Sequence, residues 1–555
     1  MVDTWVRLGL RRAFVCPGSR STPMVLALAR EDRLDVCVVH DERAAAFMAV
    51  GAARVDETPA VVVTTSGTAA AELHPAVVEA HADRVPLIAC TADRPPRLHG
   101  VGAPQTIDQQ HLFGRAARAF FDPGVPADGV HPSIAVTAAR IWAASVGPPA
   151  GPVHVNLPYE EPLVGVAEPT VGADSTADGD PKVRRARPRI DPAWLAGLVA
   201  GRRGVIVAGG HVRRPEAVLA FADAVGWPVL ADPRSGCRVP HRRVIAYFDA
   251  LLRHSGPGEP PRPDVILRCG SLPTSPGLVR WLRSTRAVQV GLEADGVRYD
   301  PDRTLDMLVA GDWETAMVEA ARSLELPASD EWQEEWSARD ALAARVIDEM
   351  VDGTGRLSEP AVARMTVQRV PQGGLLYVSA SNPVRDVEWY SAPRHDLRVL
   401  ANRGANGIDG VVSSATGSAL ASGEAWLLIG DQAFLHDLSS LVTLARLRSR
   451  VRAVVTDNRG GGIFEMLPQA ELLEREVFER FFVAPHDLDL GGIAAAFGIT
   501  SPSCDDVCGL GEALEAAGSE SGPVVVTAKA DRRESAELRR AITAEVASRL
   551  QAEFS

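Results

Sequence analysis

One local pattern recurs along most of this chain: a short run of β-branched residues is followed by a longer, Ala-rich stretch with helical character. Parallel strands need such a crossover between them, and strands buried on both faces are apolar throughout rather than alternating. The runs AVVVTT at 60–65 and AWLLIGD at 425–431 have this character. The pattern therefore predicts an α/β protein with parallel sheets covered by helices.

Breaks in this alternation divide the 555 residues into three predicted domains, a number that agrees with a usual size of roughly 150 residues each. The segment 165–192 is rich in Pro, Gly, Asp and Arg, which is typical of a linker. A charged helical stretch at 329–350 ends near Gly353, where we place the second boundary. The predicted domains are 1–165, 190–350 and 355–555.

The opening residues VDTWVRLGL read as the back half of a helix, which favours a native start upstream of Met1.

Composition excludes several classes of protein. The net charge is −13 and no basic stripe occurs, so we expect no nucleic-acid partner. No uncharged apolar run reaches the roughly 18 residues of a membrane span. The seven cysteines are scattered and contain no CxxC pair, which predicts reduced thiols and a cytoplasmic location. The only lysines, Lys182 and Lys529, lie outside the P-loop, Schiff-base and SxxK motifs.

Two predicted strands end in groups that suit a metal ion. Asp431 follows AWLLIG, and Asn458 follows VRAVVTD and precedes a glycine-rich turn. Mg²⁺ prefers hard oxygen ligands and shares them with substrate phosphates, which backbone N–H groups of such a turn can also bind. Taken singly, Asp431 would be a helix cap and the glycines a plain turn. Together they predict a metal–diphosphate site.

This pair of motifs resembles the thiamine diphosphate (ThDP) motif of the decarboxylase and synthase superfamily. The resemblance implies that Asp431, Asn458 and the backbone oxygen of Gly460 hold Mg²⁺, with Mn²⁺ as the alternative metal. Gln432 and Asp457 stand where the motif has Gly and Asn, which leaves the ligand positions intact. Further cofactor contacts are implied at Gln432, Ala433, Ile463 and Phe464.

The same resemblance assigns roles to two residues outside that motif. A carboxylate such as Glu42, between a predicted strand and helix, ordinarily stabilises the helix dipole. In the superfamily, a glutamate in this position hydrogen-bonds the cofactor's pyrimidine ring and drives its activation. Ile408 matches the bulky apolar residue that keeps the cofactor bent, whereas its ordinary role would be core packing. The resemblance also implies a homodimer as the minimum unit, and a homotetramer is compatible with it.

Six further loops together resemble the 2-succinyl-5-enolpyruvyl-6-hydroxy-3-cyclohexene-1-carboxylate synthase (MenD) family of menaquinone biosynthesis. They are CPGSRSTP at 16–23, TTSGTA at 64–69, ADRPPR at 92–97, GAPQTI at 102–107, SASNPVRD at 379–386 and NRGANGIDG at 402–410. This family decarboxylates 2-oxoglutarate and adds the product carbanion to isochorismate.

Both of these substrates are dianions, which suits several arginine forks at strand ends. For each arginine alone, a surface ion pair is the ordinary interpretation. The substrate contacts implied by the resemblance are Ser19, Arg20, Arg94, Gln105, Ser381, Arg385 and Arg403. The catalytic residues that it implies are Glu42, Arg385, Arg403 and Ile408.

The central domain departs from the family pattern. Pro276 occupies the position of a basic residue, and the sequence leaves open whether Arg280 or Arg283 replaces it or whether the contact is absent.

Other functions remain as alternatives. Another ThDP-dependent 2-oxoacid decarboxylase is less favoured because no His-His pair occurs. An acetohydroxyacid synthase or a dinucleotide oxidoreductase would need a nucleotide site, and VIVAGGHVRR at 205–214 matches GxGxxG poorly. A catalytically silent relative need not keep Glu42, Asp431 and Asn458 together.

Overall fold

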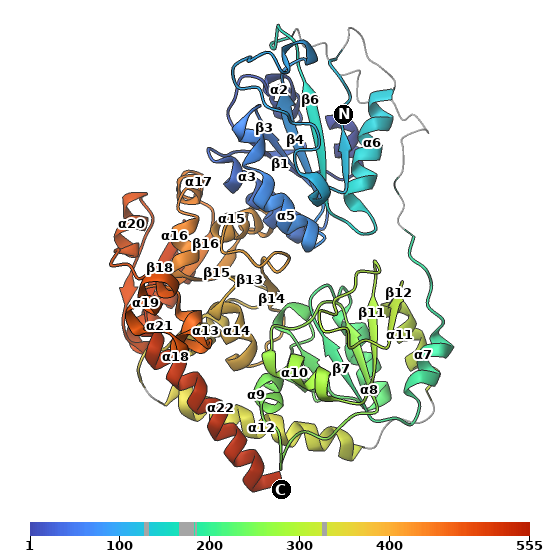
Figure 1. Cartoon of the computed structure of the whole chain (residues 1–555), viewed down its shortest axis with the longest axis vertical. Coiled ribbons are helices and arrows are strands. Elements are labelled where there is room, and N and C mark those ends of the chain that lie inside the picture. The colour runs from blue at the N-terminus through green and yellow to red at the C-terminus, as the bar shows by residue number, and fades with distance from the viewer. Residues whose placement is uncertain (127–132, 166–182, 184–185, 325–329, 354, 555) are drawn as a thin grey trace.

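The computed structural model describes residues 1–126, 133–165, 183, 186–324, 330–353 and 355–554. Three sheets of six parallel strands form three α/β units, which confirms the predicted fold class. In Figure 1 the N-terminal unit lies at the top, the central unit at lower right and the C-terminal unit at lower left. The linker predicted at 165–192 lies largely outside the described residues.

The N-terminal sheet has the order β2-β1-β3-β4-β6-β5. Its strands are β1 Arg12–Val15, β2 Asp35–Val38, β3 Ala60–Thr64, β4 Leu87–Asp93, β5 Ala119–Phe121 and β6 Pro152–Pro158. Its helices are α1 Val2–Leu8, α2 Thr22–Ala29, α3 Glu42–Asp56, α4 Thr68–Ala71, α5 His74–Ala82 and α6 Ser133–Val146.

The C-terminal sheet repeats this order as β14-β13-β15-β16-β18-β17. Its strands are β13 Leu375–Val378, β14 Arg398–Leu400, β15 Ala425–Gly430, β16 Val451–Asp457, β17 Ser503–Cys504 and β18 Val524–Lys529. Its helices are α13 Glu359–Arg369, α14 Asn382–Tyr390, α15 Val411–Ser422, α16 Asp431–His436, α17 Ser440–Leu447, α18 Gln469–Leu472, α19 Arg475–Phe478, α20 Leu490–Ala496, α21 Val507–Ser519 and α22 Arg532–Phe554. In both outer sheets the strand order reverses at one point, between β1 and β3 and between β13 and β15. Ligands of such sheets bind beyond the carboxyl ends of the strands at that point.

The central sheet has a different order, β12-β11-β10-β7-β8-β9. Its strands are β7 Gly204–Ala208, β8 Val229–Ala231, β9 Val244–Ile245, β10 Val265–Cys269, β11 Val288–Glu293 and β12 Met307–Ala310. Its helices are α7 Pro192–Val199, α8 Pro215–Val225, α9 Phe248–Arg253, α10 Pro276–Ser284, α11 Trp313–Ala321 and α12 Asp330–Asp352.

This is the order of dinucleotide-binding folds, whose ligands lie where β7 and β10 diverge. The chain's own backbone fills that crevice, because a Cβ on Gly209 would lie 1.4 Å from the carbonyl oxygen of Ser271. The geometry therefore speaks against the dinucleotide alternative.

Helices α12 and α22 tie the central and C-terminal units together. Trp332, Trp336 and Val346 on α12 share one buried core with Ile542 and Val546 on α22. Figure 1 shows the two long helices running side by side beneath both units. Among the described residues, no helix combines the length and the apolar character needed to cross a bilayer.

Backbone contact joins the N-terminal and C-terminal units, because α3 packs against α15 through glycines. A Cβ on Gly51 would lie 1.9 Å from the carbonyl oxygen of Ser414, and one on Gly417 would lie 1.9 Å from that of Met48. The two helices can approach this closely only because glycine stands at both positions.

We expect Gly417→Ala to destabilise the protein by about 1–3 kcal/mol, because the added methyl group must push α3 and α15 apart. The measurement is the shift of the urea midpoint. Gly511→Ala is the matched control, because Gly511 lies within α21 and has space for a methyl group. Its added Cβ would contact only the Met365 side chain, at 3.8 Å. That control should be neutral or stabilising by about 0.5–1 kcal/mol. Equal midpoints for the two variants would contradict the close packing.

Candidate active site

A cavity opens at the point where the strand order of the C-terminal sheet reverses, beyond the ends of β13, β15 and β16. The loop after β13 contributes Ser381, the loop after β15 contributes Asp431, and the turn after β16 contributes Asn458 and Gly460. The predicted metal-binding residues and the substrate-loop serine therefore line one cavity.

Asp431 lines this cavity and is the first residue of α16. Its Oδ1 accepts a hydrogen bond from the backbone N–H of Gln432 at 2.6 Å, and its Oδ2 accepts one from Gly460 at 2.7 Å. Burial raises the pKa of the Asp431 carboxyl to about 6. A cation beside this buried carboxylate would compensate for the lost hydration of its charge.

Asn458 and Gly460 fit a metal ion. The Oδ1 atom of Asn458 is buried and has no hydrogen-bond partner, although the side chain borders the cavity. A buried amide oxygen without a partner costs free energy unless a ligand uses it. Gly460 has φ +136°, and a Cβ there would lie 2.5 Å from the carbonyl oxygen of Val483, so this sharp turn requires glycine. The donor set consists of hard oxygens, as Mg²⁺ prefers.

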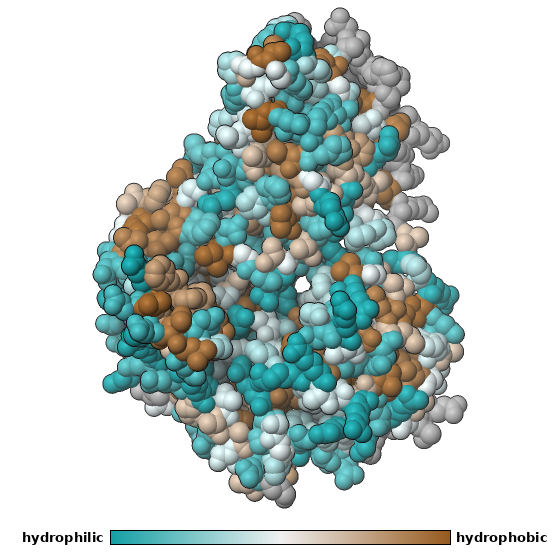
Figure 2. All heavy atoms as spheres, viewed as in Figure 1, coloured by the Kyte–Doolittle hydropathy of each residue, from teal (hydrophilic) through white to brown (hydrophobic). Residues whose placement is uncertain are grey.

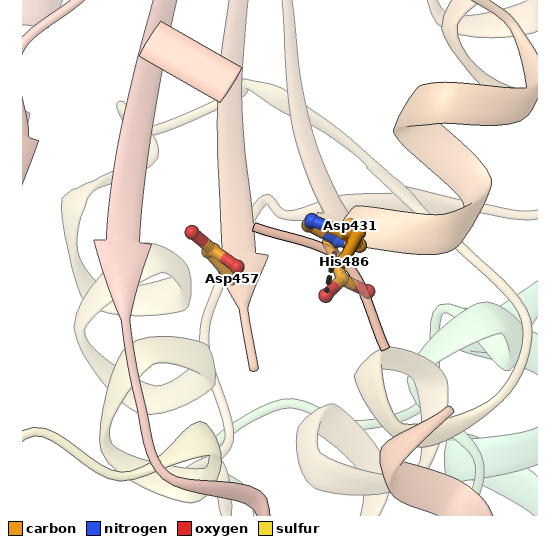
Figure 3. A group of neighbouring side chains, drawn as sticks. All are labelled: Asp431, Asp457 and His486. Atoms are coloured by element: carbon orange, nitrogen blue, oxygen red, sulfur yellow. Dashed lines mark hydrogen bonds and ion pairs between the residues drawn. The ribbon is translucent and has the colours of Figure 1, made fainter. Parts of the chain in front are cut away.

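Asp457 and His486 are further candidate metal ligands in the neighbourhood of Asp431. Figure 3 shows Asp431 joined to His486, with Asp457 at some distance from the pair. The Nε2 atom of His486 lies 3.2 Å from the Oδ2 atom of Asp431, and candidate ligand atoms of all three residues lie within 4.8 Å of one another. Asp457, however, does not line the cavity, whereas Thr456 and Asn458 on either side of it do. We therefore favour Asn458 over Asp457 as the partner of Asp431.

The other predicted cofactor contacts divide into two groups. Gln432, Ala433, Ile463 and Ile408 border the cavity, and Ile408 is 39% exposed, which excludes core packing within this chain. Phe464 does not border the cavity. Its ring packs edge-on against Phe482, with ring centroids 5.7 Å apart.

Glu42 begins α3 in the N-terminal unit. Asp41 is the N-cap, and its side chain accepts from the N–H of Ala44 at 2.9 Å, so helix capping does not require Glu42. Burial, followed by the nearby negative charges of Asp41 and Glu72, raises the pKa of the Glu42 carboxyl. A carboxyl group with a raised pKa suits proton exchange with a neutral ring nitrogen.

Two of the predicted N-terminal substrate residues, Arg94 and Gln105, contact Ser66. Arg94 donates to the Ser66 hydroxyl at 2.9 Å, and the Gln105 side chain donates to the Ser66 carbonyl at 3.0 Å. Burial, and next the charge of Arg20, lowers the pKa of Arg94. Ser19 is exposed at the loop that follows β1. These residues form one polar, cationic group at the strand ends of the N-terminal sheet.

Arg385 and Arg403 lie in the C-terminal unit, near a third guanidinium that the sequence did not reveal. Arg385 donates to the carbonyl of Ser381 at 2.6 Å. Burial, and next the charge of Arg234 in the central unit, lowers the pKa of Arg403 to about 10, and Arg385 contributes to this shift. Arg234 is held by Asp232 through contacts of 2.7 and 3.1 Å. Half-buried guanidinium groups whose charges act on one another are a suitable site for a dianion.

The central unit supplies no basic group at Pro276, which is the first residue of α10. Arg280 is exposed, and the exposed Arg283 is bonded to Asp302. In the same unit, Arg234 provides a positive charge near Arg403 from the loop after β8.

Sequence patterns missed three residues of this region: Arg234, His486 and Glu359. Arg234 and His486 follow predicted strands or lie in loops without a recognisable motif. Glu359, in LSEP at 357–360, reads as an ordinary first-turn acid after the cap Ser358. Its contact with Asn458, 99 positions away, is visible only in the folded chain.

The two groups of residues do not meet within one chain. No described residue of 1–165 lines the C-terminal cavity, although Arg43, next to Glu42, donates to the carbonyl of His436 at the end of α16 at 3.0 Å.

Family models match all three units. Residues 1–112 match the N-terminal TPP binding domain of thiamine pyrophosphate enzymes, residues 387–528 match their C-terminal TPP binding domain, and residues 191–378 match the middle domain. The solved structure of a benzoylformate decarboxylase from Polynucleobacter necessarius has the same fold, with a TM-score of 0.73 over 96% of this chain and 98% of that one at 16% identity. The chain is thus a thiamine pyrophosphate (ThDP) enzyme in its fold and domain content.

Curated relatives that are similar over nearly the full length identify the family within this class. The 2-succinyl-5-enolpyruvyl-6-hydroxy-3-cyclohexene-1-carboxylate synthase of Myxococcus xanthus is 38% identical over 99% of this chain and 97% of its own length. That of Geobacillus kaustophilus is 39% identical over 90% of this chain and 88% of its own length. The chain belongs to the 2-succinyl-5-enolpyruvyl-6-hydroxy-3-cyclohexene-1-carboxylate synthase family.

Proposed function

We propose that this protein decarboxylates 2-oxoglutarate and adds the remaining four-carbon unit to isochorismate in a 1,4-addition, as a step of menaquinone biosynthesis. The observation that carries the proposal is the cavity lined by Asp431, Asn458 and Ser381, together with Arg385, which donates to the carbonyl of Ser381. The charges of Arg385 and Arg234 also act on Arg403. Full-length identity to synthases of this name supports the same substrates.

The arginines suit substrates with two carboxylates. A guanidinium keeps its charge at neutral pH and binds a carboxylate through two parallel hydrogen bonds. Burial of Arg403 and repulsion from Arg234 and Arg385 cost free energy, as the lowered pKa of Arg403 indicates, and Asp232 and Glu388 offset part of this cost. A bound dianion would relieve this cost. Arg20 and Arg94 form the corresponding pair in the N-terminal unit.

ThDP, when bound, supplies the carbon centre that accepts electrons from the 2-oxoacid as carbon dioxide leaves. Asp431, Asn458 and the Gly460 carbonyl would hold Mg²⁺, or Mn²⁺, against its diphosphate. Glu42 would exchange a proton with its pyrimidine ring, and Ile408 would support its bent shape. In this proposal, residues 1–165 bind the pyrimidine, residues 355–555 bind the diphosphate, and residues 190–350 form the central domain.

A homodimer is part of the proposal, with a homotetramer compatible with it, because the N-terminal group would complete the cavity of a second copy. Figure 2 shows apolar residues gathered on the C-terminal unit, where Figure 1 places α16 to α20. Large exposed apolar patches usually mark contact surfaces. The exposed apolar side chains of this region are Val442, Leu467, Leu472, Val477, Phe481, Leu488 and Phe497.

A cytoplasmic location also belongs to the proposal. All seven cysteines are free thiols, and burial raises the pKa of Cys90 and Cys269 well above the ordinary value. Unpaired thiols are typical of proteins in reducing compartments.

We expect the purified protein, supplied with ThDP, Mg²⁺, 2-oxoglutarate and isochorismate, to consume isochorismate and release one carbon dioxide per product. Absorbance of isochorismate and the mass of the product measure this. A reaction without 2-oxoglutarate is the control. Consumption of pyruvate in place of 2-oxoglutarate would contradict the proposal and favour an acetohydroxyacid synthase-like enzyme.

A further inference from the structure

A network of buried polar side chains lies beside Asn458, and its members Glu359, Asn382 and Asp386 border the same cavity. Glu359 at the start of α13 contacts Asn458, Asn382 and Arg539, and Arg539 also contacts Asp386. We propose that Glu359 is a positioning residue that sets the orientation of the Asn458 amide, so that its oxygen faces the cavity. This inference rests on the metal site of the proposed function.

The orientation of an asparagine amide matters because its two ends have opposite chemistry. The NH₂ end only donates hydrogen bonds and cannot bind a metal ion, whereas the oxygen accepts and can. A flip exchanges the two ends with almost no change of shape. Without a restraint, Asn458 could therefore present either end to the cavity.

Glu359 supplies that restraint. Its Oε1 atom accepts a hydrogen bond from the Nδ2 atom of Asn458 at 2.7 Å. Because a carboxylate only accepts, it holds the NH₂ end and turns Oδ1 away from itself. This Oδ1 atom is buried, has no partner, and belongs to a side chain that borders the cavity. The free acceptor is thus the atom that a metal ion would use.

The rest of the network holds the Glu359 side chain in place. Its Oε2 atom accepts from Asn382 at 2.7 Å and from the Arg539 guanidinium at 2.8 Å. Arg539 also donates to Asp386 at 2.9 and 2.6 Å, and Glu359 and Arg539 are each 3% exposed. A buried carboxylate held in this way by a guanidinium and an amide has little rotational freedom.

The backbone around the pair is also tightly arranged. The N–H of Glu359 donates to the hydroxyl of Ser535 on α22 at 3.1 Å. A Cβ on Gly462 would lie 2.4 Å from the Nδ2 atom of Asn458 and 3.0 Å from the Oε1 atom of Glu359. A side chain at position 462 would therefore separate the pair. The C-terminal helix and the glycine turn both hold the amide in one orientation.

Glu359→Gln tests the restraint with almost no change of shape. The new carbonyl would be kept by Asn382 and Arg539, so the new NH₂ group would face Asn458. Asn458 would then flip and turn its own NH₂ group toward the cavity. We expect Mg²⁺ affinity in the presence of ThDP to fall about 10–100-fold, as for other residues that orient metal ligands. Isothermal titration with Mg²⁺ at saturating ThDP, and Mn²⁺ binding followed by electron paramagnetic resonance, measure this without turnover.

A second substitution should reverse the effect. Asn458→Asp alone would bring two carboxylates to the 2.7 Å contact and should also weaken metal binding. Combined with Glu359→Gln, it exchanges donor and acceptor, because the glutamine NH₂ would donate to the new carboxylate. We expect the double variant to bind Mg²⁺ within a few-fold of the wild type. If Glu359 were needed only for stability, the double variant would bind Mg²⁺ less tightly than either single variant.

Glu314→Gln is the matched control, because Glu314 is a buried glutamate of the central unit that accepts from the N–H groups of Arg213 and Arg214. It should bind Mg²⁺ like the wild type. This inference alone would be overturned if Glu359→Gln bound Mg²⁺ as tightly as the wild type. It would also be overturned if the double variant bound Mg²⁺ no more tightly than the two single variants. A wild-type protein that binds no Mg²⁺ with ThDP would overturn the proposed metal site, and this inference with it.

Discussion

Glu42→Gln is expected to lower turnover about 10²–10⁴-fold while ThDP binds almost as tightly as to the wild type. Glutamine keeps the shape and the hydrogen-bonding capacity of a protonated carboxyl group but cannot exchange its proton. Burial already raises the pKa of the Glu42 carboxyl, so the protonated form persists to higher pH than in a free glutamate. Steady-state rates of product formation and calorimetric titration with ThDP separate chemistry from binding.

The matched control for this variant is Glu57→Gln at the other end of α3. Glu57 is an exposed C-cap whose carboxylate lies 3.8 Å from Arg398, a contact that contributes little stability. Its turnover should equal that of the wild type. Unchanged turnover in Glu42→Gln would favour another proton-exchanging group or a catalytically silent relative. Loss of ThDP binding together with turnover would indicate a structural role.

Asp431→Ala is expected to weaken Mg²⁺-dependent ThDP binding by at least about 100-fold, more than loss of a residue that only orients a ligand. The substitution removes one proposed ligand and also the acceptor that holds the N–H of Gly460 at 2.7 Å. The glycine turn would lose the restraint that aims its carbonyl at the metal. Titration of ThDP at several Mg²⁺ concentrations measures the loss, and turnover should fall in parallel.

Asp489→Ala is the control, because Asp489 is the N-cap of α20 in the same unit. Its side chain accepts a hydrogen bond from the backbone N–H of Gly492. It should cost about 1 kcal/mol of stability and leave ThDP binding unchanged. A parallel titration of Asp457→Ala and Asn458→Ala tests the ligand set. If removal of Asp457 abolished metal binding and removal of Asn458 did not, the proposed set would be wrong.

The central strands of all three sheets could be predicted because burial on both faces leaves an uninterrupted apolar run. β15 and β16 lie where AWLLIGD and VRAVVTDN predict them. The strands β5, β9, β12 and β17 carried no such signal. They stand at or next to sheet edges and are short, and β12 is largely exposed, so little of their sequence is constrained by packing.

The candidate site was predictable to the extent that its residues follow strands. Asp431 and Asn458 come after neighbouring parallel strands, so the sheet itself brings them to one edge. Arg234 could not be predicted as a neighbour of Arg403, because that contact depends on how the central unit packs against the C-terminal one. The complete site, with Glu42 beside the cofactor, stays a prediction.

By itself, the sequence determined the class of fold, the family, and the residue types available at each strand end, because apolar periodicity and short motifs are local properties of a chain. Only the tertiary structure decided which of those residues meet and how each is oriented. The direction in which the Asn458 amide points depends on Glu359, 99 positions away. Such a contact arises from the packing of α13 against β16 and α22, and no local pattern encodes it.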